Sequence, residues 1–362
     1  MSKKDYTRLV KLIANPGAGN AAEAPQNIEL VVGALEKQGL KVDLVLANPS
    51  ERGTRLAKRA VKDGYKLIVA MGGDGTIEAV MRGMLDSKVR LGIIPNGTRN
   101  NIAKSLGIPK NLEEACALIA TDAALKVDMG QVTTRKGKKF FFFELATLGL
   151  SASLYPEANK IGDGKISNLR AAALTFIHHE TRPKVFLTLD NESKIEVETM
   201  SIIVSNTPTF GENFLVAPHA SLRDGLLDVS VYPDFSKAEL LRYYAEVMDG
   251  GYSGDTKVQH YQARKVKIKA SPKLDVMADG VALGNGSVKI KVRAGVLRVI
   301  TTEKNVPLEK QPRGAKGRDV ATTPEAKSSA RQKARAQDKM RPAPASPTVG
   351  KNHREKSAVS PH

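Results

Sequence analysis

Met71-Gly-Gly-Asp-Gly-Thr76 is the stretch that decides the fold of this 362-residue chain. It follows the apolar run Leu67-Ile-Val-Ala70 and precedes apolar residues spaced i, i+3, i+4, i+7 and i+8 from Ile77. The first pattern predicts a buried strand and the second predicts one face of a helix. Glycine backbone and a helix N-terminus on such a turn favour an anion, usually phosphate. The carboxylate of Asp74 fits a phosphate site if Mg²⁺ lies between the carboxylate and the phosphate. The alternative interpretation is an ordinary tight turn.

Two more glycine-containing loops follow predicted strands. Asn15-Pro-Gly-Ala-Gly-Asn20 comes after the β-like run 8–14, and Pro95-Asn-Gly-Thr-Arg-Asn100 comes after the strand 91–94. Strands alternate with helical patterns throughout this part of the chain, which predicts a parallel sheet covered on both faces. Ligands of such sheets bind beyond the carboxyl ends of the strands, where all three loops lie. The residues alone therefore favour a nucleotide site.

The pattern changes after about residue 122, where most segments are typical of strands. The predicted strands are 125–132, 139–147, 184–189, 194–204, 227–232, 258–270 and 287–301. Two helices interrupt them, one at 165–179 and one that begins with the capping box Ser236-Lys-Ala-Glu239. We therefore predict a first domain over 1–122, a mainly antiparallel second domain over 123–302 and a tail over 303–362. The last strands of the second domain either stay within it or return toward the first.

Charge and composition limit the functions that are open. The net charge is +18, and residues 303–362 contain 14 Lys and Arg against 6 Asp and Glu, a net charge of +8. This tail contains few large apolar residues, so we expect it to be disordered. It suits an anionic membrane surface, whereas nucleic acid is disfavoured because the tail lacks aromatic residues that stack on bases. A single cysteine argues against disulfides, and no apolar run approaches the ~20 residues that span a bilayer.

The ordered motifs resemble the diacylglycerol kinase catalytic-domain family, which includes bacterial diacylglycerol kinases and other lipid kinases, among them sphingosine kinases. Gly72-Gly-Asp-Gly-Thr76 matches its nucleotide signature, and Asn15-Pro-Gly-Ala-Gly19 is similar to its first phosphate loop. The stretch from Leu91 to Pro109 is similar to its second motif. The segment from Ser205 to Asp228 resembles its second-domain motif. The resemblance spans residues 8–301.

The resemblance implies an α/β domain of the NAD kinase and diacylglycerol kinase type, followed by a β-sandwich domain, with ATP and Mg²⁺ as cofactors. Asp74 and Asp279 would be catalytic, and Asp74 would also hold the Mg²⁺ that accompanies ATP. Asp224 would hold a possible structural Mg²⁺. The ATP-binding residues that the resemblance implies are Asn15, Gly19, Gly72, Gly73, Asp74, Gly75, Thr76, Gly97, Thr98 and Asn100. From the residues alone, Asp279 is more typical of an Asp-Gly hairpin turn.

Several positions differ from the usual family pattern. Val281 replaces the Glu of the D-G-E pattern that contains Asp279, and Arg99 replaces a glycine of the second motif. Asn101 stands where Asp is usual, and Glu78-Ala79 stands where Asn-Glu is commoner. The first loop has Ala18 for Ser, and the second domain has Gly-Glu-Asn at 211–213 for Gly-Gly-Gly.

The function that the resemblance implies is an ATP-dependent lipid kinase, a phosphotransferase with an alcohol group as acceptor. Such an enzyme would act on a lipid substrate from the cytoplasm, bound peripherally to the membrane. An NAD kinase-like enzyme shares the Gly-Gly-Asp-Gly turn and is one alternative. A non-catalytic nucleotide or lipid sensor is another, based on Val281 and Arg99. Neither the acceptor lipid nor the oligomeric state, a homodimer included, follows from the sequence.

Overall fold

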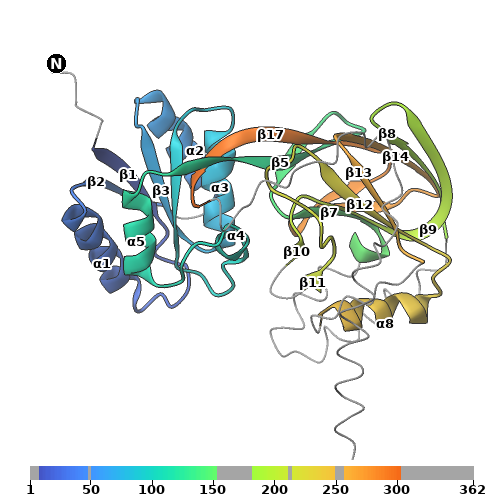
Figure 1. Cartoon of the computed structure of the whole chain (residues 1–362), viewed down its shortest axis with the longest axis horizontal. Coiled ribbons are helices and arrows are strands. Elements are labelled where there is room, and N and C mark those ends of the chain that lie inside the picture. Colours follow the sequence, from blue (N-terminus) through green and yellow to red (C-terminus); the bar gives the residue numbers. More distant parts are fainter. Residues whose placement is uncertain (1–7, 48–49, 153–181, 211–213, 249–256, 303–362) are drawn as a thin grey trace, which may run out of the picture. The chain divides into compact units, whose positions relative to one another are not determined.

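The computed structural model describes residues 8–47, 50–152, 182–210, 214–248 and 257–302 (Figure 1). The predicted helix 165–179, the residues 211–213 and the tail 303–362 lie outside this range. The first part of the chain alternates strands and helices as expected. Its elements are β1 (Leu9–Ala14), α1 (Ala24–Lys37), β2 (Lys41–Leu46), α2 (Ser50–Lys62), β3 (Leu67–Gly72), α3 (Asp74–Met84), β4 (Arg90–Pro95), α4 (Asn101–Ser105) and α5 (Leu112–Ala120).

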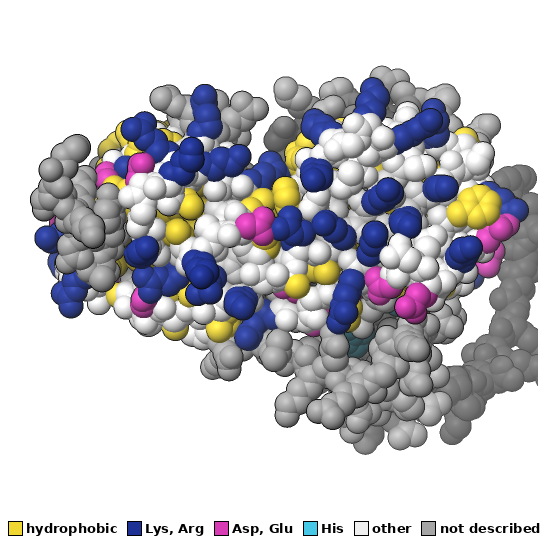
Figure 2. All heavy atoms as spheres, turned by 90° about the horizontal axis from the view of Figure 1, so that it is seen from above, with side chains coloured by type: hydrophobic (Ala, Val, Ile, Leu, Met, Phe, Trp, Pro, Cys, Tyr) yellow, Lys and Arg dark blue, Asp and Glu magenta, His cyan; other side chains and the backbone are white. Residues whose placement is uncertain are grey.

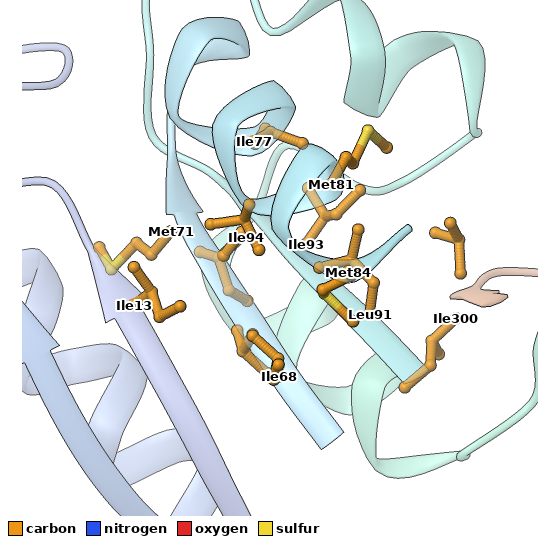
Figure 3. Close-up of a cluster of buried hydrophobic side chains, with 14 of the residues drawn as sticks. Ile13, Ile68, Met71, Ile77, Met81, Met84, Leu91, Ile93, Ile94 and Ile300 are labelled. Atoms are coloured by element: carbon orange, nitrogen blue, oxygen red, sulfur yellow. The ribbon is translucent and has the colours of Figure 1, made fainter. Parts of the chain in front are cut away.

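The strands of this region form a parallel sheet in the order β2-β1-β3-β4, which confirms the α/β prediction. Every residue of β3 is buried, as expected for a central strand covered by helices on both faces. Apolar side chains of β1, β3, β4 and α3 pack into one cluster, and Ile300 from the far end of the chain joins it (Figure 3). The carboxyl ends of β1, β3 and β4 therefore stand on a rigid, fully packed base.

The second part of the chain is built from antiparallel strands and forms the predicted β-sandwich, with a buried apolar cluster of its own. Among the described residues of this region, α8 (Lys237–Met248) is a helix. The first strands are β5 (Ala124–Thr134), β6 (Lys139–Phe142), β7 (Leu145–Gly149), β8 (Lys184–Leu189), β9 (Ser193–Ser205), β10 (Thr209–Phe210) and β11 (Phe214–Leu215). They are followed by β12 (Leu227–Pro233), β13 (Gln259–Ala263), β14 (Lys265–Ser271), β15 (Asp275–Ala278), β16 (Val281–Asn285) and β17 (Val288–Ile300).

The long strand β17 belongs to both sheets. Residues 288–291 pair with β14 in the antiparallel region, and Val299 pairs in parallel with Leu91 of β4. Along almost its whole length β17 also pairs with β5, with an irregularity between Arg293 and Leu297. The two strands run together across both regions (Figure 1). The last strand of the chain thus completes the nucleotide-type sheet at the open side of β4.

Three findings about local elements differ from the predictions. The single predicted strand 258–270 is in fact two strands, β13 and β14, which pair with different neighbours. The single predicted strand 139–147 is in fact two strands, β6 and β7, because the backbone at Phe143 and Glu144 turns its N–H groups toward a side chain described below. The hairpin formed by β15 and β16 was not predicted as a pair of strands. By contrast, the capping box is confirmed: Ser236 N donates to Glu239 Oε2 at 2.8 Å, and Glu239 N donates to Ser236 Oγ at 3.2 Å. Among the described residues, no helix combines the length and the apolar character that crossing a bilayer requires.

Candidate functional site

The three glycine-containing loops meet at the carboxyl ends of β1, β3 and β4. Asn15 N donates to the carbonyl oxygen of Met71 at 3.0 Å, and Asn96 N donates to that of Gly72 at 3.0 Å. The side chain of Asn15 then joins the first loop to α3, because its Nδ2 donates to Thr76 Oγ1 at 2.8 Å. The side chains that the sequence singled out in separate motifs are therefore in contact. Asn15 and Thr76 hold these loops together.

Two glycines allow the loops to approach each other closely. Gly19 has φ +68°, and a Cβ there would lie 2.7 Å from the carbonyl oxygen of Asn96. A Cβ on Gly97 would collide with the backbone of Gly73. Since a larger residue at either position would push the backbones apart, these glycines are required by the packing of one loop on another. This observation is independent of any ligand.

Asp74 begins α3, whose N-cap residue Gly73 offers no side-chain cap. One oxygen of Asp74, Oδ1, accepts a hydrogen bond from Ile102 N at 2.9 Å. Asp74 therefore caps the first turn of α4 from a different element, a position where a carboxylate also interacts favourably with the helix dipole. This contact accounts for one of its two oxygens and joins the first turn of α3 to the first turn of α4.

Asn100 organises the second motif from within. The backbone of Asn100 adopts the left-handed conformation, with φ +53°. Its side chain makes two hydrogen bonds with Gly97: Gly97 N donates to Asn100 Oδ1 at 2.8 Å, and Asn100 Nδ2 donates to Gly97 O at 2.7 Å. Thr98 and Arg99, at the tip of this loop, are exposed, as is Gly75 on α3. Asn100 thus shapes the loop, whereas Thr98 and Arg99 are the side chains that reach solvent.

Asp279 is a hairpin-turn residue, as its Asp-Gly pair suggests, and its carboxylate also makes contacts far along the chain. Asp279 and Gly280 form the turn between β15 and β16, with φ +40° and +77°. At the same time, its carboxylate accepts hydrogen bonds from the backbone N–H groups of Phe143, Glu144 and Leu145 at 2.5, 3.1 and 3.0 Å. Burial raises the pKa of Asp279 to about 6, although these three donors act in the opposite direction. It is a hairpin residue whose side chain is built into the protein interior.

Glu78 and Arg82 are the functional candidates to which sequence reasoning assigned no role. They follow Asp74 at i+4 and i+8, so the three side chains share one face of α3. Glu78 is paired with Arg82, whose guanidinium also donates to Phe141 O at 3.3 Å and lies 4.2 Å from the ring centroid of Phe140. The spacing of three charged residues on a mostly buried helix was the signal available in the sequence.

The electrostatics of α3 link the two parts of the candidate site. Burial, together with the negative charges of Asp279 and Asp74, raises the pKa of Glu78 to about 8, and the Arg82 guanidinium offsets only part of this. Glu78 thus interacts electrostatically with both aspartates. Near neutral pH Glu78 therefore largely retains its proton, whereas Asp279 is largely ionised. A group of this kind can accept and return a proton.

Asp224 lies in the segment between β11 and β12. Its Oδ1 accepts from Leu226 N at 2.9 Å, within a local turn. The neighbouring Gly225 N donates to Asp128 Oδ2 at 2.7 Å, and Gly295 N donates to Asp128 Oδ1 at 2.6 Å. No three His, Cys, Asp or Glu side chains gather as a metal site anywhere in the described ranges. A structural Mg²⁺ at Asp224 stays a prediction.

Comparison with known families supports the division of the fold. Residues 9–132 match the family model described as the diacylglycerol kinase catalytic domain. Residues 147–301 match the model of the YegS C-terminal NAD kinase beta sandwich-like domain. The first match contains all three glycine-containing loops, and the second contains Asp224 and Asp279. Both halves of the candidate site are therefore found in matched regions.

Curated relatives extend over most of the chain. A diacylglycerol kinase of Mycobacterium tuberculosis is 26% identical over 273 residues, which cover 75% of this chain and 88% of the relative. A diacylglycerol kinase of Bacillus subtilis is 28% identical over 281 residues, covering 75% and 89%. A probable lipid kinase YegS-like protein of Pseudomonas aeruginosa is 28% identical over 305 residues, covering 82% and 94%.

The same fold occurs among solved structures. The structure of a diacylglycerol kinase from Bacillus anthracis superimposes with a TM-score of 0.64. It covers 83% of this chain and 98% of the other, at 22% sequence identity. At this identity the likeness concerns the fold, which agrees with the two-part architecture described above.

Proposed function

Because this chain belongs to the diacylglycerol kinase catalytic-domain family, we propose that it is an ATP-dependent lipid kinase. It would transfer the γ-phosphoryl group of ATP to a hydroxyl group of diacylglycerol or a related lipid. The observation that carries the proposal is the meeting of three glycine-containing loops around Asp74, with two backbone approaches that admit no Cβ. The proposal places the enzyme at a cytoplasmic membrane surface, since its acceptor resides in the bilayer.

The residues around Asp74 fit a triphosphate with a divalent cation. The N-terminus of α3 carries no side-chain cap, and such a terminus favours phosphate. Ile102 N donates a hydrogen bond to Oδ1 of Asp74, so the other oxygen would bind the cation. The buried Oδ1 of Asn101, the residue before Ile102, has no hydrogen-bond donor among the described residues. Asp74 and Asn101 would thus supply oxygen ligands of the kind that Mg²⁺ prefers.

Mg²⁺, when bound, would neutralise charge on the phosphates during transfer. The residues of the chain would provide positioning and proton handling. The glycine loops would present backbone N–H groups to the phosphates, and Asp279 would accept the proton of the lipid hydroxyl. Its raised pKa of about 6 keeps it ionised near neutral pH and closer to the working pH than an ordinary aspartate.

We assign to Glu78 a supporting role beside Asp279. The family pattern usually places a Glu two residues after the aspartate, where this chain has the exposed Val281. Glu78 supplies a carboxyl group near Asp279 from a different element, and its interaction with Asp279 is the largest charge contribution to its raised pKa. In this proposal Glu78 holds a proton that stabilises the ionised Asp279, and Arg82 keeps Glu78 in place.

The test is transfer of labelled γ-phosphate from ATP and Mg²⁺ into a mixed-lipid extract. Wild type, Asp74→Asn and Asp74→Ala are compared. Asn retains an oxygen that accepts from Ile102 N, so Asp74→Asn removes the charge and keeps the cap of α4. We expect a labelled lipid in the wild type and a loss on the order of 100-fold or more with Asp74→Asn. Thermal stability should stay close to that of the wild type.

The outcomes separate the proposed kinase from its alternatives. Chromatography of the labelled lipid names the acceptor class, and a parallel reaction with NAD as acceptor tests the related soluble-substrate reaction. Bound ATP with no labelled product in any extract or with NAD would contradict the kinase assignment and favour a nucleotide sensor. Equal turnover by wild type and Asp74→Asn would remove Asp74 from the site.

A further inference from the structure

Seven lysines lie on the outer face of the sheet that runs through β6, β5, β17, β14, β8 and β9. We call this set the lysine face; its members are Lys139, Lys194, Lys265, Lys267, Lys269, Lys289 and Lys291. On β14 and β17 they alternate with buried valines and isoleucines of the sandwich core. Because side chains alternate between the two faces of a strand, these lysines all point away from the core. Figure 2 shows Lys and Arg side chains spread over this side of the molecule, with few acidic side chains among them.

Strand register places the lysines directly opposite one another. Lys265 pairs with Lys291, and Lys267 pairs with Lys289. The second row continues outward in register: Lys289 lies opposite Thr133, which lies opposite Lys139. On the other side, Lys267 lies opposite Thr188, which lies opposite Lys194. One row across six strands thus contains four lysines and two threonines, with no acidic residue.

This arrangement costs stability in the free protein. Like charges directly opposite on neighbouring strands are destabilising, and none of the seven lysines forms an ion pair among the described residues. Protection of a sheet edge does not explain the five lysines of β14 and β17, since these are interior strands with a partner on each side. The positive charge is concentrated on a broad face and is left uncompensated.

The margin of the lysine face differs from its centre. Glu196 of β9 is paired with Lys184 of β8. Asp86, which follows α3, is paired with Arg293 of β17. Between Lys184 and the central lysines lies Phe186, whose side chain is 43% exposed and stands opposite Lys269. Neutralised pairs therefore lie at two places on the margin of an unpaired basic centre, and one exposed aromatic ring lies between this centre and the margin.

We propose that the lysine face docks the protein on the surface of an anionic lipid bilayer. A flat array of lysines complements the negative potential of such a surface, to which each nearby Lys contributes about fivefold in affinity. The exposed ring of Phe186 suits the interfacial layer, where aromatic side chains are favoured. The inference rests on the proposed function in one respect: a kinase whose acceptor is a lipid needs a contact with the membrane.

Nucleic acid is the less suitable polyanion for this surface. Base recognition relies on Arg and Asn or Gln in bidentate geometry, and single strands bind to several aromatic platforms. The lysine face offers ammonium groups and one aromatic ring on a broad sheet rather than in a groove. Its chemistry therefore matches a planar distribution of negative charge.

The experiment compares two quadruple variants of the full-length chain with equal net charge. The first carries Lys265→Gln, Lys267→Gln, Lys289→Gln and Lys291→Gln. The matched control carries Lys58→Gln, Lys62→Gln, Lys88→Gln and Lys110→Gln, at exposed lysines of the first region. Co-sedimentation is measured at about 0.1 M salt, with vesicles of phosphatidylcholine alone and with vesicles that also contain phosphatidylserine. A DNA duplex is used as a separate probe.

We expect the wild type and the control to bind the phosphatidylserine vesicles. The face variant should bind them several hundred-fold more weakly, about fivefold for each lost lysine. It should melt at the same temperature or higher, because it loses the opposed charges. Its turnover on a lipid dispersed in neutral detergent should be unchanged. Equal weakening in both variants, equal binding to neutral vesicles, or a loss confined to the duplex would overturn the proposal. Asp74→Asn should keep vesicle binding, so failure of the kinase assignment and failure of the docking face are distinguishable.

Discussion

At the scale of single residues, the candidate site depends on carboxyl groups with two tasks each. Asp74 caps α4 with one oxygen, and in the proposed function its other oxygen binds the cation. Asp279 holds the backbone of residues 143–145 through three N–H groups. Substitution by alanine would therefore remove a structural contact together with a charge. Asp279→Asn is equally unsuited as a clean test, since its NH₂ group would face an N–H donor in a buried position.

The pH dependence of stability tests the environment of Glu78. Its pKa is raised from 4.5 to about 8, so the folded protein retains a proton between these values that the unfolded chain releases. The stabilising contribution is complete below about pH 4.5 and is lost as the pH rises through about 8. Glu78→Gln should therefore become more stable relative to wild type with increasing pH, by on the order of a few kcal/mol across this window.

Urea unfolding at about pH 5 and about pH 8.5 measures this difference. The exposed Glu36→Gln on α1 is the matched control, and we expect its stability relative to wild type to be the same at both pH values. A Glu78→Gln variant whose relative stability does not change with pH would show that Glu78 is ionised throughout and holds no proton near Asp279.

The meeting of the three glycine-containing loops was predictable from the sequence, whereas the environment of Glu78 was not. Glycines and short polar residues after strands are local signals, and the carboxyl ends of parallel strands necessarily meet. The neighbourhood of Glu78 depends on β6 and on the turn at Asp279, about 200 residues further along the chain. Spacing on α3 shows that Glu78 shares a face with Asp74, yet only the tertiary structure shows that this face is buried against a second carboxylate.

At the scale of elements, the hairpin formed by β15 and β16 explains why one long strand was wrongly predicted over residues 139–147. Strand patterning there is continuous, so nothing local indicates a break. The break arises because the three N–H groups at 143–145 bind Asp279 instead of a neighbouring strand. The contact between Asp279 in the hairpin turn and residues 143–145 thus accounts for the interruption of the strand.

Gly280 should be required for this contact. Its φ is +77°, a conformation that costs an alanine about 1–2 kcal/mol. Gly280→Ala should lower the free energy of unfolding by about this amount and reduce turnover, because the turn that positions Asp279 is disturbed; Gly280→Asn should do less on both counts, since Asn tolerates this conformation.

A second glycine provides the control for Gly280. Gly137 has φ +79° in the turn between β5 and β6, with no atoms near the position of a Cβ. Gly137→Ala should therefore cost similar stability while leaving turnover unchanged. Denaturant unfolding and phosphate transfer are measured for all three variants. If Gly137→Ala and Gly280→Ala reduce turnover equally, general destabilisation explains the effect and the hairpin has no special role at the site.

At the scale of the whole molecule, we propose that the domain boundary at residue 122 separates the sequence motifs of the two domains. It does not mark the end of the hydrophobic core of the first domain. The apolar cluster under the nucleotide-type sheet includes side chains from well beyond this position: Val127, Met129, Phe143, Leu222, Val296, Leu297, Val299 and Ile300. The reason is the parallel pairing of β17 with β4, which follows a return of the chain across about 200 residues. Hydrophobic periodicity predicts that 288–300 is a strand, but it cannot name its partner.

The last prediction follows from this pairing. A fragment of residues 1–122 would leave β4 as an open edge and would remove Val299, which pairs with Leu91, and Ile300 from the core. We expect this fragment to lack a cooperative thermal transition and to aggregate, whereas residues 1–302 should unfold at a temperature close to that of the full chain. Circular dichroism melts of the two fragments and the full chain measure this.

Mixing in a peptide of residues 286–302 tests the cause directly, since restored cooperativity would identify the missing strand as the defect. A fragment of residues 1–122 that melts cooperatively near the temperature of the full chain would instead establish an independent domain, in which β17 is an accessory to the sheet rather than part of its core.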